Sequence, residues 1–352
     1  MIHVSAVSTP ALLVDRSTFD ANVAAAEQMV RGAGKHLRPH FKTHRVPALA
    51  LREVTSAVIG STCATVGEAE VLVKAGVADI LLANEFVTAD KTRRIARLAT
   101  RASVMVAADA GEQLDSLSRA ASAAGSTVGV LVDIDVGLGR CGVSTLAEAT
   151  SLAAIAARLP GLRFAGIMGY EGRVKMSDTG GGDRLARAFR TLAEAKAAIE
   201  AAGLKVEVVS GSGTSTLPEA LADPTLTEIQ AGTYCLMEPD IDGLGLPFRG
   251  AVAVLATVIS RNPPRVVVDA GRRTIGCDKG LPICLEPGGR VQSVSDEHVT
   301  LSWDGPPPAL GDRVRLRPTQ NRTTFNLHDA VWLVGPDGKA EELKVEARGL
   351  SR

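Results

Sequence analysis

The chain has 352 residues, of which 45% are hydrophobic and 22% are charged, a profile typical of a globular protein with room for one large domain and a smaller one. Its 39 Lys and Arg residues balance 39 Asp and Glu residues, and only 3% of its residues are aromatic, which argues against nucleic acid or an anionic membrane as a partner. We therefore expect a small-molecule ligand.

Neither the N-terminus nor the cysteines indicate export. The opening "MIHVSAVSTPALLVD" lacks the charged start and apolar core of a signal peptide, and no uncharged apolar run is long enough to span a membrane. The cysteines are odd in number and lack CxxC or CxxH spacing, which argues against a disulfide framework and a thiolate zinc site. These features predict a reducing, cytoplasmic location; the residues concerned are Cys63, Cys141, Cys235, Cys277 and Cys284.

From residue 11 to about 240, strand-like and helix-like segments alternate. The predicted strands are 11–15, 56–62, 79–84, 103–109, 129–136, 163–170, 206–212 and 226–232. The predicted helices are 20–34, 67–76, 89–100, 110–125, 146–159 and 184–203, several of which end in glycine. Eight βα units over this length predict an α/β fold, the (β/α)8 TIM barrel. The competing doubly wound sheet lacks support, because no GxGxxG follows the first strand.

The pattern changes near "EPDIDGLGLP". Strand-like runs at 251–260, 265–271, 289–303, 311–318 and 330–335 are separated by Pro and Gly turns and show no helical period. We therefore predict a barrel domain over residues 11–244, and a C-terminal β domain over 245–352 that also includes residues 1–10.

Five polar motifs follow predicted strands of the barrel. They are "HFKTH", "DVGLGRCG", "GYEG", "SGSGTST" and "QAGTY". Because a TIM barrel carries its chemistry at the carboxyl ends of its strands, we expect these motifs to meet at one mouth.

Lys42 lies in "RPHFKTHR", between His40 and His44. Neighbouring cations and partial burial would lower the pKa of its amine and make it nucleophilic, so that it could hold an aldehyde cofactor as a Schiff base. The structural alternative is a solvated surface lysine.

"VVSGSGTST" (208–216) has the small residues and hydroxyl groups that let backbone N–H groups cradle a phosphate. It is not a Walker motif, because no GK[ST] ends it. The alternative is a simple turn, but its position among the late strands of a barrel favours the phosphate site.

Three further residues stand in these motifs. Arg140 lies in the Gly-rich "DIDVGLGRCGV", where the alternative is a structural ion pair with Asp133 or Asp135. Tyr170 and Tyr234 are the chain's two tyrosines, and both are predicted at strand ends rather than in cores, although each could also be a packing residue with a hydrogen-bonded hydroxyl.

In order along almost the whole chain, these stretches resemble the fold-type III pyridoxal-phosphate enzymes, in particular the branch of D-threonine aldolase and D-serine dehydratase. "TPALLVDRSTFDANV" is similar to the family opening and "RPHFKTHR" to its cofactor-lysine motif, while "VVVDAG" and "TFNLHDAVWLV" are similar to motifs of its β domain.

The resemblance implies a role for each motif. Lys42 would form the Schiff base with pyridoxal 5'-phosphate, Arg140 would face the pyridine nitrogen, and Tyr170 would lie beside the cofactor near the substrate. Because the pKa of arginine is above about 12, Arg140 cannot fully protonate the ring, which leaves a weaker electron sink. The remaining predicted cofactor contacts are His40, Ser210, Gly211, Ser212, Gly213, Thr214, Gln230, Gly232, Thr233 and Tyr234.

The sequence departs from this branch at its metal motif. The resemblance implies the pattern P-x-H-x-[D/C]-x-T-x-N before "LHD", with the histidine and the acid or thiol as metal ligands. This chain instead reads "PTQNRTTFN" (318–326). Gln320 and Arg322 occupy the two positions, and arginine has no lone pair and repels a cation. We expect no metal, and a catalytic role for Arg322; His328 and Asp329 follow in "LHD".

The resemblance implies a homodimeric lyase that acts on β-hydroxy-D-amino acids, with D-threonine-aldolase-like retro-aldol cleavage favoured and Lys42 or His44 moving protons. The alternatives are D-serine-dehydratase-like elimination, an amino-acid racemase of the same fold type, or a non-catalytic cofactor carrier. The sequence does not identify the β-substituent, the dominant reaction or the pathway.

Overall fold

The computed structural model describes residues 1–172, 174 and 178–351, and the chain divides into two compact units. One comprises residues 26–42, 50–232 and 350–352, and we call it the barrel unit; the other comprises 1–25, 43–49 and 233–349, and we call it the β unit. None of the described helices is both long and apolar enough to cross a membrane.

The barrel unit contains an eight-stranded sheet in the order β3-β10-β9-β8-β7-β6-β5-β4, with every pair parallel. Parallel bridges from Leu37 to Val58 and from His40 to Thr62 join its first and last strands. This confirms the predicted barrel. The strands are β3 (His36–Leu37), β4 (Ser61–Cys63), β5 (Asp79–Leu82), β6 (Ser103–Ala108), β7 (Val128–Asp133), β8 (Leu162–Gly169), β9 (Val208–Gly211) and β10 (Glu228–Ile229).

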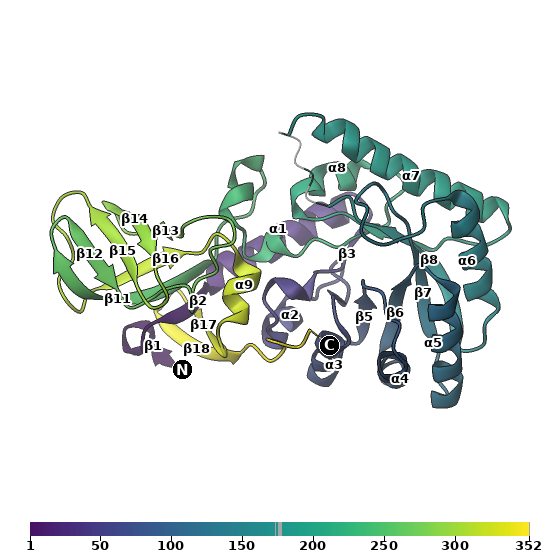
Figure 1. Cartoon of the computed structure of the whole chain (residues 1–352), viewed down its shortest axis with the longest axis horizontal. Helices are drawn as coiled ribbons and strands as arrows, with labels where there is room; N and C mark the ends of the chain where they lie inside the picture. The colour runs from purple at the N-terminus through teal and green to yellow at the C-terminus, as the bar shows by residue number, and fades with distance from the viewer. Residues whose placement is uncertain (173, 175–177, 352) are drawn as a thin grey trace. The chain divides into compact units, whose positions relative to one another are not determined.

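Helices cover the outer face of these strands, as Figure 1 shows for α3 to α7. The predicted glycine caps are confirmed at Gly76 and Gly125, which adopt left-handed conformations and donate to carbonyls in the last turns of α3 and α5. The helices of the alternating region are α1 (Arg16–Gly32), α2 (Pro47–Glu53), α3 (Val66–Ala75), α4 (Ala89–Leu98), α5 (Gly111–Ala124), α6 (Leu146–Arg158), α7 (Gly181–Ala201) and α8 (Leu217–Ala222).

The barrel strands read as continuous apolar runs because they are buried on both faces. Alternate side chains such as Met105 and Ala107 point into one interior cluster with Leu81, Leu131 and Met168. The residues between them, for example Val104 and Val106, are equally buried.

The β unit contains a ten-stranded sheet. Strands predicted from the C-terminal sequence are all present, and strand β1 pairs with β18 in the same sheet. The short helix α9 (Asn321–Asn326) was not predicted. The strands are β1 (Ile2–His3), β2 (Ala11–Asp15), β11 (Val252–Asn262), β12 (Arg265–Val268), β13 (Ile283–Cys284), β14 (Gly289–Val294), β15 (Val299–Trp303), β16 (Arg313–Arg317), β17 (Ala330–Val334) and β18 (Lys339–Lys344).

One strand belongs to a different sheet from the one expected. We counted residues 11–15 as the first barrel strand, but β2 pairs with β11 and β17 in the β unit, where Leu13 joins a core with Val7 and Leu255. The eighth barrel strand is instead β3, at the start of the Lys42 motif. The predicted domain boundary near residue 244 remains a prediction.

Candidate active site

Lys42 lies at the carboxyl end of barrel strand β3. Beyond β3 the chain stays attached to both neighbours, because Thr62 N donates to Pro39 O at 2.8 Å and His40 N donates to Ala231 O at 3.2 Å. The chain then turns through the 3-10 helix Phe41–Thr43, in which Lys42 is half-buried. The lysine therefore sits at the end of the barrel where active sites of this architecture occur.

Arg140, Tyr170 and Gly213 come together at this end of the barrel. The Arg140 guanidinium carbon lies 5.9 Å from the centre of the Tyr170 ring. A Cβ atom on Gly213 would lie 3.6 Å from Tyr170 Cε2, so the ring flanks the "SGSGTST" loop. Three of the five predicted motifs thus meet, as the sequence predicts.

Backbone N–H groups of the Arg140 loop donate hydrogen bonds to the carboxylates of Asp135 and Asp109. Asp135 Oδ1 accepts hydrogen bonds from Gly137 N at 2.9 Å and Gly139 N at 3.0 Å, and Asp109 Oδ2 accepts one from Gly142 N at 3.0 Å. No carboxylate of the described residues forms an ion pair with Arg140, which is exposed. The alternative of a structural ion pair is therefore not supported.

A cluster of carboxyl groups around the buried Asp133 lies beside this loop and was not anticipated. Burial first, and then a hydrogen bond with the Glu85 carboxyl, raise the pKa of Asp133 to about 8, while the charge of Arg140 opposes the shift. Because Asp109 directly follows strand β6 and Glu85 lies three residues after strand β5, their positions near strand ends were the available signal.

The same cluster offers three possible metal ligands. Atoms of Glu85, Asp109 and Cys141 lie within 4.8 Å of one another. Burial and Glu85 raise the pKa of the Cys141 thiol to about 11, so without a bound cation the thiol is neutral near pH 7.

The "SGSGTST" loop is tied to the "GYEG" loop by buried side chains. Thr216 Oγ1 donates to Glu171 Oε1 at 2.6 Å and lies 2.7 Å from Ser212 Oγ. Burial raises the pKa of Glu171, while the hydrogen bonds from Thr216 and Ser212 oppose the shift. The sequence did not single out Glu171 or Thr216. Close backbone approach also requires Gly211, because a Cβ atom there would lie 2.4 Å from Gly169 O.

Two predicted phosphate ligands have side chains engaged inside the barrel. Ser210 Oγ donates to Glu228 Oε1 at 2.7 Å and accepts from Gln230 Nε2 at 3.0 Å. The other oxygen of Glu228 accepts from Arg38 Nε at 2.9 Å, and Arg38 also pairs with Asp79 at 2.7 Å. These side chains stabilise the barrel interior, and the roles of Ser210 and Gln230 in cofactor binding remain predictions.

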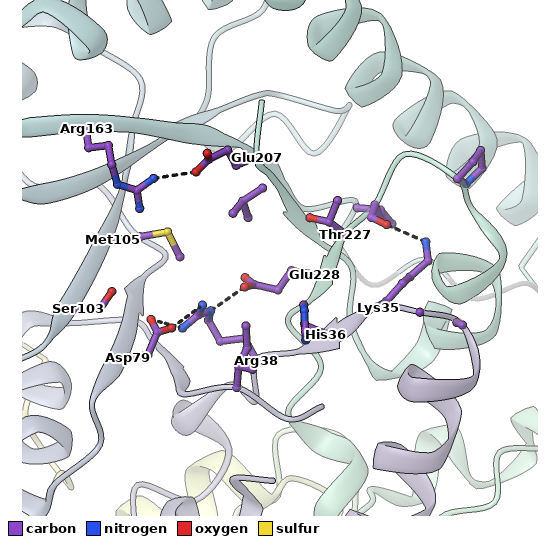
Figure 2. A pocket seen from close by; sticks show the side chains of 16 residues that line it. Lys35, His36, Arg38, Asp79, Ser103, Met105, Arg163, Glu207, Thr227 and Glu228 are labelled. Carbon is purple, nitrogen blue, oxygen red and sulfur yellow. Dashed lines mark hydrogen bonds and ion pairs between the residues drawn. The ribbon is translucent and has the colours of Figure 1, made fainter. Parts of the chain in front are cut away.

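A cavity of about 640 Å³ lies at the opposite end of the barrel, beside the amino ends of the strands (Figure 2). Its charged groups already have partners: Arg38 pairs with Asp79 and Glu228, and Arg163 pairs with Glu207. This end of a TIM barrel usually serves stability rather than catalysis.

In the β unit, the "QAGTY" turn continues into 3-10 helix Thr233–Cys235. Tyr234 is completely buried and packs edge-on against Phe248, with ring centres 5.6 Å apart. The expectation that Tyr234 lies outside a core is therefore wrong, because its ring fills the apolar interior. Thr233 O accepts the backbone bonds of Leu236 and Met237 that shape the turn.

His44 is also in the β unit and is almost completely buried. Its Nδ1 accepts a hydrogen bond from Val46 N at 3.0 Å, and its ring contacts Phe325 edge-on with centres 6.3 Å apart. The proton transfer predicted for this residue remains a prediction.

Non-glycine residues with left-handed backbone mark the motifs. In the described structure they are Arg45 (φ 58°), Ser212 (φ 66°) and Met237 (φ 52°). One lies in "RPHFKTHR", one in "SGSGTST" and one three residues after "QAGTY". Such strained conformations concentrate at functional sites, because the surrounding structure must hold them.

Comparison with known families defines the class. Residues 14–239 match the family "Alanine racemase, N-terminal domain", and residues 251–334 match "Putative serine dehydratase domain". The chain therefore belongs to the alanine racemase N-terminal family, in the branch that carries a serine dehydratase domain.

Individual relatives narrow the comparison. The chain is 37% identical to D-threonine aldolase of Arthrobacter sp, over 98% of this chain and 94% of the relative. The crystal structure of D-threonine aldolase from Filomicrobium marinum matches with a TM-score of 0.94 and 35% identity, over 100% of this chain and 98% of the other. D-threo-3-hydroxyaspartate dehydratase of Delftia sp. (strain HT23) is 27% identical over 95% of this chain and 96% of the relative.

Proposed function

We propose that this protein is a pyridoxal-phosphate-dependent lyase that cleaves β-hydroxy-D-amino acids by a retro-aldol reaction. The observation that carries the proposal is the meeting of Arg140, Tyr170 and Gly213 at the end of the barrel from which Lys42 emerges. Similarity to D-threonine aldolase over nearly the whole of both chains supports it.

The residues present fit the cofactor. The exposed Arg140 forms no ion pair with any residue that the structure describes, and Tyr170 is the side chain that a Cβ atom on Gly213 of the "SGSGTST" loop would meet. Lys42 would bind the aldehyde carbon, and the loop with Thr214, Gly232 and the "QAGTY" turn would bind the phosphate. When bound, pyridoxal phosphate supplies an electron sink next to the substrate's α-carbon.

The reaction breaks the Cα–Cβ bond and the O–H bond of the β-hydroxyl group. The β-carbon and its oxygen leave as an aldehyde, the bonding electron pair stays with the α-carbon, and a proton added there completes glycine. The chain must therefore orient the hydroxyl group and accept its proton, and we assign the proton transfers to Lys42 or His44.

Replacement of Lys42 tests the cofactor assignment. Lys42→Ala should lose the visible Schiff-base absorbance and the borohydride-reducible adduct, whereas the exposed Lys74→Ala, on the barrel helix α3, should keep both. A reducible adduct that persists in Lys42→Ala would overturn the assignment.

Elimination is the second candidate, because the dehydratase of Delftia sp. also matches nearly the whole chain. It would convert the same substrates into ammonia and a 2-oxo acid, while a racemase would produce the L-isomer without cleavage. We also propose a cytoplasmic homodimer, a location in keeping with five cysteines that are all free thiols.

A further inference from the structure

Gln320 and Arg322 of the β unit occupy the two positions to which the family resemblance assigns ligands of a divalent metal. Their side chains do not fit a metal. Arg322 has no lone pair, and its charge repels a cation. Of the two ring nitrogens of His328, Nε2 is not available to a metal, because it donates to Thr274 O at 2.8 Å. Asp329 is exposed and pairs with Arg348 at 2.6 Å.

The segment is nevertheless held firmly at its start. Asn321, between the two residues, donates from its backbone to Glu238 Oε1 at 3.0 Å and from its side chain to Met237 O at 2.8 Å. Lys279 pairs with the same glutamate. The strained turn at Met237 therefore fixes the backbone that carries Gln320 and Arg322.

The end of helix α9 contacts the residues that directly follow Lys42 in the chain. Phe325 packs against the His44 ring, and Asn326 Oδ1 accepts a hydrogen bond from Arg45 Nη1 at 2.9 Å. These contacts lie within the β unit and tie α9 to the continuation of the predicted cofactor-lysine motif.

Gln320 and Arg322 each present a buried polar atom without a hydrogen-bond partner among the described residues: Gln320 Oε1 is an acceptor and Arg322 Nε is a donor. Buried polar atoms are rarely left unsatisfied, so Gln320 Oε1 requires a partner that gives a hydrogen bond and Arg322 Nε one that takes a hydrogen bond. A hydroxyl group does both, whereas a carboxylate has no hydrogen for Gln320 Oε1.

From this chemistry we infer that Gln320 and Arg322 bind the substrate's β-hydroxyl group in place of a divalent metal. Gln320 Oε1 accepts the hydroxyl hydrogen, and Arg322 donates to the oxygen and stabilises the negative charge that develops there. The inference rests on the proposed function. It adds that the enzyme needs no metal and acts on amino acids whose side chain carries a free β-hydroxyl group.

The first test measures metal directly, in the absence of substrate. Holoenzyme purified without chelator should contain substoichiometric divalent metal and should bind no Mn²⁺ in calorimetric titration. The double variant Gln320→His, Arg322→Asp restores the donor pair of the family motif and should bind one Mn²⁺. Mn²⁺ binding by the wild-type protein equal to that of the double variant, or EDTA-sensitive activity, would overturn the inference.

The second test separates a hydroxyl contact from a general effect. Arg322→Ala should lower kcat/KM for D-phenylserine about 100-fold, as expected for the loss of one donor to a developing oxyanion. Its inhibition constant for D-phenylalanine, which lacks the hydroxyl group, should stay within about twofold of wild type. Arg290→Ala, an exposed arginine on strand β14, is the matched control and should retain full activity.

The outcomes keep the two proposals apart. An unchanged kcat/KM in Arg322→Ala, or a loss confined to substrates with a second carboxylate such as 3-hydroxy-D-aspartate, would overturn the hydroxyl assignment. A missing Lys42 adduct would instead overturn the proposed function, while the metal titrations would still decide whether this segment binds a cation.

Discussion

The buried Asp133, hydrogen-bonded to Glu85 beside the Arg140 loop, should make stability depend on pH in an unusual direction. Burial and the Glu85 hydrogen bond raise the pKa of Asp133 from 3.8 to about 8. Between about pH 4 and pH 8, the folded protein therefore keeps a proton on Asp133 that the unfolded chain has already released. The free energy of unfolding falls as pH rises through this window. Asp133→Asn cannot lose a proton, so it should remove this dependence.

The size of the effect follows from the shift. Each pKa unit corresponds to about 1.36 kcal/mol, so a rise of about four units limits the contribution to about 6 kcal/mol across the window. Between pH 5 and pH 8.5, we expect the free energy of unfolding of wild type to fall by several kcal/mol relative to that of Asp133→Asn. The amide of this variant can still donate a hydrogen bond to Glu85.

Urea unfolding at pH 5, 7 and 8.5 measures this difference directly. The matched control is Asp115→Asn, the same substitution at an exposed position on helix α5, which should follow the wild-type pH dependence. A stability difference between Asp133→Asn and wild type that stays constant over this range would refute the reasoning.

Three further predictions concern the barrel, the phosphate loop and the assembly. Arg38→Met should destabilise the protein by about 3–5 kcal/mol in urea unfolding, because it leaves the buried Glu228 without its partner, and an equal loss in the surface variant Arg163→Met would contradict this. Thr216→Val should weaken pyridoxal phosphate binding about tenfold, because Glu171 loses a donor that shapes the loop; the same weakening in Thr150→Val, a half-buried threonine of helix α6, would show that the effect is not specific. Light scattering after size exclusion should find a dimer, and an active monomer would contradict the proposed assembly.

Most of the barrel was predictable because its strands and helices have strong local patterns. Strand β3 was not predicted, because it has only two residues and these are too few to show a periodic pattern. Residues 11–15 were assigned to the wrong sheet for a different reason: an apolar run does not specify its partners, and β11 lies more than 200 residues away in the chain. The six residues of α9 were likewise too few to show a helical period.

The candidate site shows the same limit. The strand-end motifs correctly placed Arg140, Tyr170 and Gly213 together, because carboxyl ends of parallel strands share one edge. The supporting groups were not predicted, since Glu171 and Thr216 are 45 residues apart in the chain and become neighbours only in the folded barrel. The burial that perturbs Asp133 is likewise a property of packing, not of local sequence.

The most direct test of the proposed function is a product analysis with D-phenylserine and the holoenzyme. Retro-aldol cleavage predicts equal amounts of benzaldehyde and glycine, with no ammonia released. Formation of ammonia and a 2-oxo acid, or of L-phenylserine without any benzaldehyde, would contradict the proposal.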